Sequence, residues 1–194
     1  MKTADDPSCM KKIKKVFMIS YDAKVDEELI QKILKKNYSR IPVYFGHENK
    51  RLVIGILLTK SLIGVNLNES LTVAQLISQK KCKIKEPLYV KPDTSLETIL
   101  KLFQQGFVHQ AIVVDNPEAI SKDAETVAQY LCEENEDESK NQLDALQKQT
   151  KKHNVMGIVT MEKVLETYLN TKFLDEKDRS KVENYRLNDT SQSS

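Results

Sequence analysis

The segment that decides the fold is VIGILLTKSLI at residues 53–63, which returns as VMGIVTMEKVL at residues 155–165. Two other segments repeat in the same order. VFMISYDAKVDE from Val16 matches PLYVKPDTSLET from Pro87, and YSRIPVY from Tyr38 matches FVHQAIV from Phe107. Three matches in one order indicate two copies of a single unit. A unit that cannot bury its apolar face alone packs on its twin, and the cleft between twins is a natural ligand site.

Hydrophobic periodicity predicts the same elements in both copies. Each copy begins with a lead-in strand and continues as helix, strand, strand and helix, with Asp93 as an expected N-cap in the second copy. The fold class is therefore α/β (α+β): tandem β-α-β-β-α units related by a pseudo-twofold, with small mixed sheets covered by helices. The expected helices are DEELIQKILKKN, a short one beginning at TKSLIGV, SLETILKLFQQ and MEKVLETYL, and the expected strands are VFMIS, RIPVYF, RLVIGILL, PLYVK, QAIVVD and VMGIVT.

We expect five segments along the chain. They are a basic N-terminal segment (1–15), a first unit (16–70), a connecting helix (71–83, containing LTVAQLIS), a second unit (84–172) and an acidic then polar C-terminal tail (173–194). The tail is expected to be disordered at its end.

The second copy carries roughly 33 additional residues between its two central strands, at about 116–154. This insertion contains the acidic run CEENEDES and two weakly helical patches, at 119–131 and 143–151. Long connections inside compact domains are either functional or disordered. A disordered segment or a loose surface helix is one interpretation, and a partner-binding arm is the other.

Composition is that of a globular, soluble chain. Of 194 residues 40% are hydrophobic, and the net charge of +2 creates no long-range field that would favour nucleic acid. Cys9, Cys82 and Cys132 form neither a disulfide framework nor a CxxC pair, which favours a reducing compartment. The chain has no apolar run of the roughly 20 residues that span a bilayer, and its N-terminus lacks the apolar core of a signal peptide.

The sequence contains no recognisable motif for catalysis or for binding a metal ion. It contains no nucleophile elbow, no Gly-rich phosphate loop and no HExxH motif. His47 and His153 fall in expected loops, and His109, beside an apolar strand, is expected to be structural. We therefore expect a protein that is not an enzyme.

The repeated unit resembles the CBS domain, which occurs in tandem pairs known as Bateman modules. More narrowly, the chain resembles the cyclin M, or ancient conserved domain protein, family of magnesium transport mediators and their bacterial CorC relatives. The resemblance covers residues 10–178 apart from the insertion. It is carried by FMI (17–19), YSRIPVY (38–44), GFVHQAIVV (106–114), GIVTMEKVLE (157–166) and FLDEKD (173–178).

This resemblance implies an adenine nucleotide, usually ATP with magnesium, in the cleft between the units. It also implies a homodimer, and a membrane domain in the same parent protein that leaves this chain on the cytoplasmic side. The residues that match the family's nucleotide site are Tyr38, Arg40, Ile41, Pro42, Thr160 and Lys163. Tyr38, Ile41 and Pro42 would line a slot for the base, Arg40 would lie near the phosphates, and Thr160 would begin a helix whose free N–H groups favour an anion. The family's phosphatase partner is not implied, because the insertion replaces the loop that binds it.

Three positions depart from the family pattern. Lys163 and Ser61 replace the carboxylates that would accept hydrogen bonds from a ribose, and Lys11 replaces a small hydroxyl residue. An ammonium supplies only donors, so these substitutions weaken ribose binding, whereas Lys163 and Lys11 would suit phosphates. Plainer interpretations stay open: Thr160 as a helix cap, Arg40 as a surface charge, and the lysines at 11, 12, 14 and 15 as a solvated face or as a contact with acidic lipid.

Three functions remain open. The first is a regulatory module of a magnesium or divalent-cation transport mediator that senses an adenine nucleotide. The second is a nucleotide-sensing pair that belongs to an unrelated enzyme. The third is a dimerisation scaffold without a nucleotide, which the substitutions at Ser61 and Lys163 favour.

Overall fold

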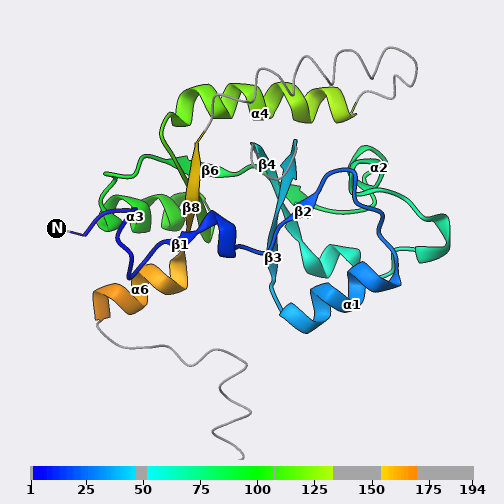
Figure 1. The fold of residues 1–194 in the computed structure, drawn as a ribbon, viewed down its shortest axis with the longest axis horizontal. Helices are drawn as coiled ribbons and strands as arrows, with labels where there is room; N and C mark the ends of the chain where they lie inside the picture. Colours follow the sequence, from blue (N-terminus) through cyan, green and yellow to red (C-terminus); the bar gives the residue numbers. More distant parts are fainter. Residues whose placement is uncertain (1, 47–51, 107, 133–153, 170–194) are drawn as a thin grey trace, which may run out of the picture.

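Two four-stranded mixed sheets form the centre of the protein in the computed structural model, which describes residues 2–46, 52–106, 108–132 and 154–169 (Figure 1). This confirms the predicted mixed fold. The strands are β1 (Lys11–Lys12), β2 (Ile19–Ser20), β3 (Arg40–Phe45), β4 (Leu52–Leu58), β5 (Ile84–Lys85), β6 (Leu88–Val90), β7 (Gln110–Val114) and β8 (Val155–Thr160). The α-helices among the described residues are α1 (Glu27–Lys36), α2 (Val73–Ser78), α3 (Leu96–Gly106), α4 (Pro117–Cys132) and α6 (Met161–Leu169).

Both sheets share one topology, as the internal repeat predicts. One sheet has the strand order β5-β4-β3-β2 and the other the order β1-β8-β7-β6. In each sheet the lead-in strand is parallel to the central strand, and the other pairings are antiparallel. The short helix expected from TKSLIGV is a 3-10 turn, Thr59–Leu62.

The register of the central strands corrects one of the sequence matches by a single residue. Val43 pairs with Gly55 and Val113 pairs with Gly157, so the two valines occupy equivalent places. Continuing along each strand, Arg40 is equivalent to Gln110, whereas the sequence match had aligned it with His109. A shift of one residue moves a side chain to the opposite face of a strand. The correction therefore changes which residues share a face.

Each sheet is completed by a short strand that precedes the other unit. β1, from the N-terminal segment, pairs with β8 of the second unit, and β5, from the linker, pairs with β4 of the first. Each short strand lies close to a glycine of the strand that it pairs with. A Cβ on Gly157 would overlap the Lys11 carbonyl oxygen and lie 2.8 Å from Met10 Cγ, and one on Gly55 would overlap the Ile84 side chain.

The rest of the N-terminal segment also lies against the second unit. The Ala4 backbone N–H donates to the Thr94 carbonyl at 2.8 Å, and the Leu96 N–H donates to the Lys2 carbonyl at 3.1 Å. Ala4 and Cys9 are buried in the core of that unit. The basic segment at residues 1–15 thus contributes to the second unit from residue 2 onward.

Helix α1 and its counterpart α3 begin at side-chain caps. The Asp26 carboxylate accepts a hydrogen bond from the Leu29 N–H at 2.8 Å, and the Ser95 hydroxyl accepts one from the Thr98 N–H at 3.1 Å. The prediction of Asp93 as the cap of α3 was therefore wrong. Ser95 directly precedes the helix, which is the position where a side chain reaches the free N–H groups of the first turn.

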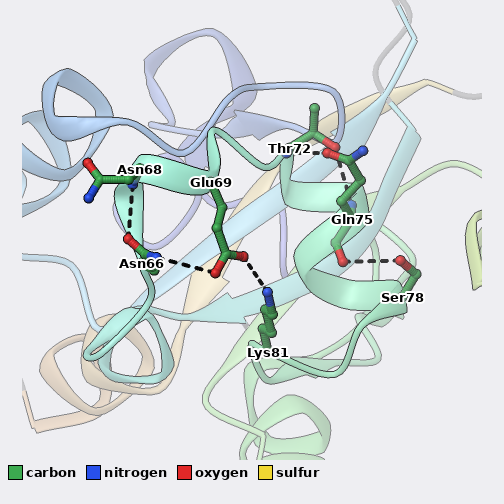
Figure 2. Close-up of polar contacts among 7 residues, drawn as sticks. All are labelled: Asn66, Asn68, Glu69, Thr72, Gln75, Ser78 and Lys81. Carbon is green, nitrogen blue, oxygen red and sulfur yellow. Dashed lines mark hydrogen bonds and ion pairs between the residues drawn. The ribbon is translucent and has the colours of Figure 1, made fainter.

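The linker between the units folds as predicted, with a helix over Val73–Ser78. Thr72 and Gln75 form a reciprocal capping box at its start, at 3.2 and 2.9 Å (Figure 2). Lys81 binds the Glu69 carboxylate, and this hydrogen bond lowers the pKa of Glu69 (Figure 2). The contact between Lys81 and Glu69 joins the linker to the first unit.

Helix α4 forms the first part of the insertion and is packed rather than loose. Asn116 caps it by accepting a hydrogen bond from the Ala119 N–H at 3.2 Å. Ile120 and Val127 are fully buried and Ala124 nearly so, in a core cluster built mostly from the first unit that also includes residues of β7 and β8. The helix contacts β4, β6 and α2, on the side of the sheets opposite α1 and α6 (Figure 1). The acidic run, the patch at 143–151 and the C-terminal tail lie outside the described residues.

A hydrogen bond crosses between the two units. The Tyr89 hydroxyl, on β6 of the second unit, donates to the Val53 carbonyl on β4 of the first. Tyr89 also packs against the core cluster that contains the buried residues of the first unit together with some of β7 and β8. Within the described ranges, no helix is long and apolar enough to cross a membrane.

Candidate functional site

A cavity of about 660 Å³ opens between the two units. Its walls come from β1, β3, β7, β8 and the start of α6, so neither unit forms it alone. The residues that line it are Lys11, Val16, Phe17, Asn37, Tyr38, Ser39, Arg40, Pro42, His109, Gln110, Ile158, Thr160, Met161, Glu162 and Leu165.

The wall from the first unit follows α1. Asn37 ends that helix with φ of 52°, a left-handed conformation that asparagine tolerates, and the chain then enters β3. Tyr38 is 38% exposed, and its ring lies 6.3 Å from that of Phe17. Lys11 Nζ lies 5.3 Å from the centre of the Tyr38 ring and 3.4 Å from its hydroxyl oxygen. An aromatic face and a cation therefore stand together on this wall.

The wall from the second unit contains an unusual buried amide. Gln110 is only 4% exposed and lies at the start of β7, opposite Thr160 of β8. Its Nε2 has no hydrogen-bond partner in the described part of the chain. A buried donor without a partner costs about 1–3 kcal/mol. A ligand acceptor in the cavity would remove that cost.

Thr160 ends β8 and begins α6. Its Oγ1 accepts a long hydrogen bond, 3.4 Å, from the Lys163 N–H, and the Met161 N–H donates to the His109 carbonyl at 3.0 Å. The positive end of the α6 dipole points towards this corner. The corner therefore suits an anion better than a cation.

His109 also lines the cavity, and its surroundings disfavour protonation. Burial is the main cause of its lowered pKa, and the positive charges of Arg40 and Lys85 add to it. An anionic ligand in the cavity would oppose this effect, because it would stabilise the imidazolium form.

A second cavity of about 420 Å³ adjoins the first and shares Lys11, Ile158 and Thr160 with it. Its walls combine the N-terminal segment with the start of α6. Lys11, Lys12, Lys15 and Lys163 all line it, together with the carboxylate-bearing Asp5. Lys163 Nζ lies 2.6 Å from Glu166 Oε2, and its side chain is 47% exposed.

The structure brings most of the predicted site residues together. Tyr38, Arg40, Pro42 and Thr160 line the first cavity, and Lys163 lines the second. Ile41 is fully buried in the core of the first unit and lies outside both walls. Pro42 tolerates its place in β3 because β2 pairs only with the later residues Val43 and Tyr44.

Ser61 lies elsewhere. Its hydroxyl donates to the Leu58 carbonyl at 2.7 Å and accepts from the Lys83 N–H at 2.9 Å. The hydroxyl thus joins the 3-10 turn to the linker.

Among the wall residues that were not predicted as site residues, His109 and Gln110 bear the polar groups discussed above. His109 had been interpreted as structural, and Gln110 had not been considered. A sequence signal for Gln110 exists, because it is the only amide in the otherwise apolar strand QAIVV. The described residues contain no group of three His, Cys, Asp or Glu side chains arranged to hold a metal ion.

Comparison with known proteins agrees with this architecture. The CBS domain family model matches residues 10–68 and 80–120, and the chain belongs to that family.

Two named relatives are similar to the chain over part of their own length. The chain is 36% identical over 107 residues to a DUF21 domain-containing protein of Arabidopsis thaliana, covering 54% of this chain and 23% of the relative. It is 27% identical over 170 residues to the metal transporter cnnm-1 of Caenorhabditis elegans, covering 87% of this chain and 17% of the relative. The chain thus spans less than a quarter of either relative's length.

A solved structure shares the fold. The CBS domain of a bacterial CNNM/CorC family Mg²⁺ transporter, described in complex with ATP, superposes with a TM-score of 0.53 at 20% identity. The match covers 84% of this chain and 85% of the other. This likeness shows the shared fold. Together with the family match and the metal transporter relative, it confirms the predicted resemblance to the CBS pairs of magnesium transport mediators.

Proposed function

We propose that this CBS pair is the regulatory module of a magnesium or divalent-cation transport mediator and that it senses an adenine nucleotide between its two units. The observation that carries the proposal is the cavity between the units, which is lined by Tyr38, Arg40 and the buried Gln110, whose Nε2 has no hydrogen-bond partner among the described residues. The ATP complex of the bacterial CNNM/CorC domain supports the choice of ligand.

The chemical groups on the cavity walls suit the parts of an adenine nucleotide. Tyr38 offers an aromatic face to a base, and Gln110 offers a donor to a ring nitrogen, which is a hydrogen-bond acceptor. Arg40 and the start of α6 offer positive charge to phosphates. Magnesium would enter with the phosphates of the ligand, as the resemblance implies.

A ligand between the units gives a route for regulation. Because both units form the walls, a bound nucleotide would fix their relative position, and a small rigid-body shift of this kind is a common switching movement. Such a shift would act on a membrane domain of the same parent protein and on a homodimer formed by two CBS pairs. The module itself would perform no catalysis.

Thermal melting with ATP, AMP and magnesium tests the proposal. A nucleotide at about 100 times its dissociation constant should stabilise the protein by about 2.7 kcal/mol, or several degrees at this chain length. The shift should disappear in the Arg40→Ala, Thr160→Ala double variant and persist in the control Lys32→Ala, whose ammonium pairs with Glu28 on exposed α1. No shift with any nucleotide in the wild type would refute nucleotide sensing.

A dimerisation scaffold is the alternative that a specific observation favours. The Ser61 hydroxyl is engaged by backbone groups, and Lys163 pairs with Glu166. Neither position offers a free carboxylate to a ribose. Sedimentation analysis that shows a dimer unaffected by nucleotide, together with no melting shift, would support the scaffold.

A further inference from the structure

We infer that the linker between the two units forms part of a surface that binds the anionic headgroups of a lipid membrane. The surface consists of Lys60, Lys80 and Lys83 together with the exposed Ile63, and it is called the basic linker surface below. Neither cavity has any of these four residues on its described walls. The surface is therefore separate from the proposed nucleotide site and does not depend on it.

Lysines are concentrated in the part of the linker that follows α2. Four of the six residues at 80–85 are lysines. Glu69 pairs with Lys81 (Figure 2), and Glu86, which follows the segment, adds one more opposing charge. Within the described ranges, no carboxylate pairs with the three lysines of the basic linker surface. Because the whole chain has a net charge of only +2, this surplus of positive charge is local.

The backbone holds the segment with its lysines turned outward. Cys82 is buried and Ile84 packs against the core, whereas Lys81, Lys83 and Lys85 are exposed. In an extended segment, alternate residues point to the same side. The three lysines therefore share one face, and the burial of the residues between them prevents the segment from turning over.

The turn that carries Lys60 and Ile63 lies directly beside this face. The Lys83 N–H donates to the Ser61 hydroxyl at 2.9 Å, and the Leu58 N–H donates to the Lys83 carbonyl at 3.1 Å. Lys60 precedes Ser61 in the 3-10 turn, and Ile63 is the C-cap of that turn. Charged and apolar groups thus meet on one surface.

Ile63 distinguishes a lipid surface from other anionic partners. Its side chain is 83% exposed, more than any other large apolar side chain in the described part of the chain. Its counterpart in the second unit, Leu165, is half-buried and lines the first cavity. An aliphatic side chain among lysines suits a membrane interface, because it enters the acyl boundary while the ammonium groups stay among the headgroups. A nucleic acid would bind the lysines but offers no apolar layer to Ile63.

Lys80 has a backbone conformation that favours glycine. It follows the C-cap of α2 with φ of 55°, in the left-handed region. Residues held in such conformations are concentrated at functional positions. A lysine in place of glycine here supports a contact made by its ammonium group.

Cosedimentation of the whole chain with lipid vesicles tests the surface. Vesicles of phosphatidylcholine with about one-third phosphatidylserine should bind the protein at low salt, and vesicles of phosphatidylcholine alone should not. Each lysine near an anionic membrane contributes about fivefold in affinity, so Lys60→Glu with Lys83→Glu should weaken binding at least about 25-fold. Ile63→Ser should weaken it about fivefold to tenfold. Failure of the wild type to bind the phosphatidylserine vesicles would overturn the inference.

Lys14→Glu with Lys15→Glu is the matched control. Both lysines are exposed and lie in the 3-10 turn after β1, and the double variant changes the net charge by the same amount. Vesicle binding should fall less than about threefold, and both double variants should melt like the wild type. Equal losses in the two double variants would overturn the inference, because binding would then reflect net charge alone. Equal affinities for vesicles and for a short DNA duplex would also overturn it.

Lys80→Gly separates function from structure at the end of α2. Glycine relieves the left-handed backbone, so we expect a higher melting temperature together with vesicle binding weakened about fivefold. The alternative is a stabilising contact between the ammonium group and the dipole of α2. A lower melting temperature with unchanged vesicle binding would establish that alternative and overturn the role of Lys80 in the surface.

Discussion

The Tyr89 hydroxyl donates a hydrogen bond to the Val53 carbonyl and so joins β6 of the second unit to β4 of the first. Tyr89→Phe would remove the donor and leave that carbonyl without this partner. A buried acceptor left unsatisfied costs about 1–3 kcal/mol, so the free energy of unfolding should fall by this amount. Urea unfolding of the variant measures it. A change below about 0.3 kcal/mol would show that the hydroxyl contributes nothing to joining the units.

Cys82 should make stability depend on alkaline pH. Burial raises its pKa from 9.0 to about 11. The unfolded thiol therefore loses its proton at a lower pH than the native thiol. Above pH 9 the unfolded state binds fewer protons, and stability falls as pH rises towards 11. The urea midpoints of the wild type and of Cys82→Ala should differ at pH 8, and this difference should disappear by pH 11. Parallel curves across this range would contradict the assignment.

Gly157→Ala should loosen β1. The new Cβ would overlap the carbonyl oxygen of Lys11, and backbone cannot move aside as a side-chain end can. Overpacking of this kind costs about 1–3 kcal/mol, and amide hydrogens of residues 10–12 should exchange faster. Gly55→Ala is the comparison, because there the Cβ meets the Ile84 side chain. Exchange at residues 10–12 that matches the wild type would refute the close approach.

Helix α4 should contribute strongly to the stability of the packed pair of units. Ile120 is fully buried in the core cluster that contains residues of both units, and the helix contacts β4 and β6. Ile120→Ala should therefore cost about 2–5 kcal/mol. The exposed Glu118, on the same helix, provides the control Glu118→Ala, which should stay within about 0.5 kcal/mol of the wild type. Equal effects in thermal melting would mean that the helix does not pack on the sheet.

Gln110→Met should separate binding from stability. Methionine has a similar length and no polar donor, so it removes the unsatisfied amide of the free protein. We expect unchanged or slightly raised stability without ligand, because the desolvation cost disappears. Nucleotide affinity should fall about tenfold. A loss of stability in the free protein together with unchanged affinity would assign Gln110 a purely structural role.

The sequence predicts the elements that have their own periodicity. The helices over Glu27–Lys36 and Leu96–Gly106 and the apolar strands around Gly55 and Gly157 were all predicted, because a helical or strand pattern of several residues is a local signal. The strands β1 and β5 were missed, since two residues carry no period. These two strands form because the folded chain brings them beside β8 and β4, which contain Gly157 and Gly55.

Several wall residues of the first cavity were predicted, because their sequence motif is local. The motif YSRIPVY predicted Tyr38, Arg40 and Pro42 on the cavity wall, where the structure places them. Gln110 was missed because an ungapped alignment aligned Arg40 with His109, and only the pairing of β7 with β8 fixes the register. The lysines of the second cavity were seen as a charged cluster, but their meeting with Lys163 depends on where β1 lies.

The exchange of short strands between the halves has a consequence for how the chain folds as it is synthesised. β1 leaves the ribosome before every other described strand, yet its partner β8 is the last of the described strands to emerge. The first unit can close once β5 has emerged, whereas the N-terminal strand must wait unpaired. The second sheet is therefore completed late during synthesis and folding, and the lysines around α6 come together only at that stage.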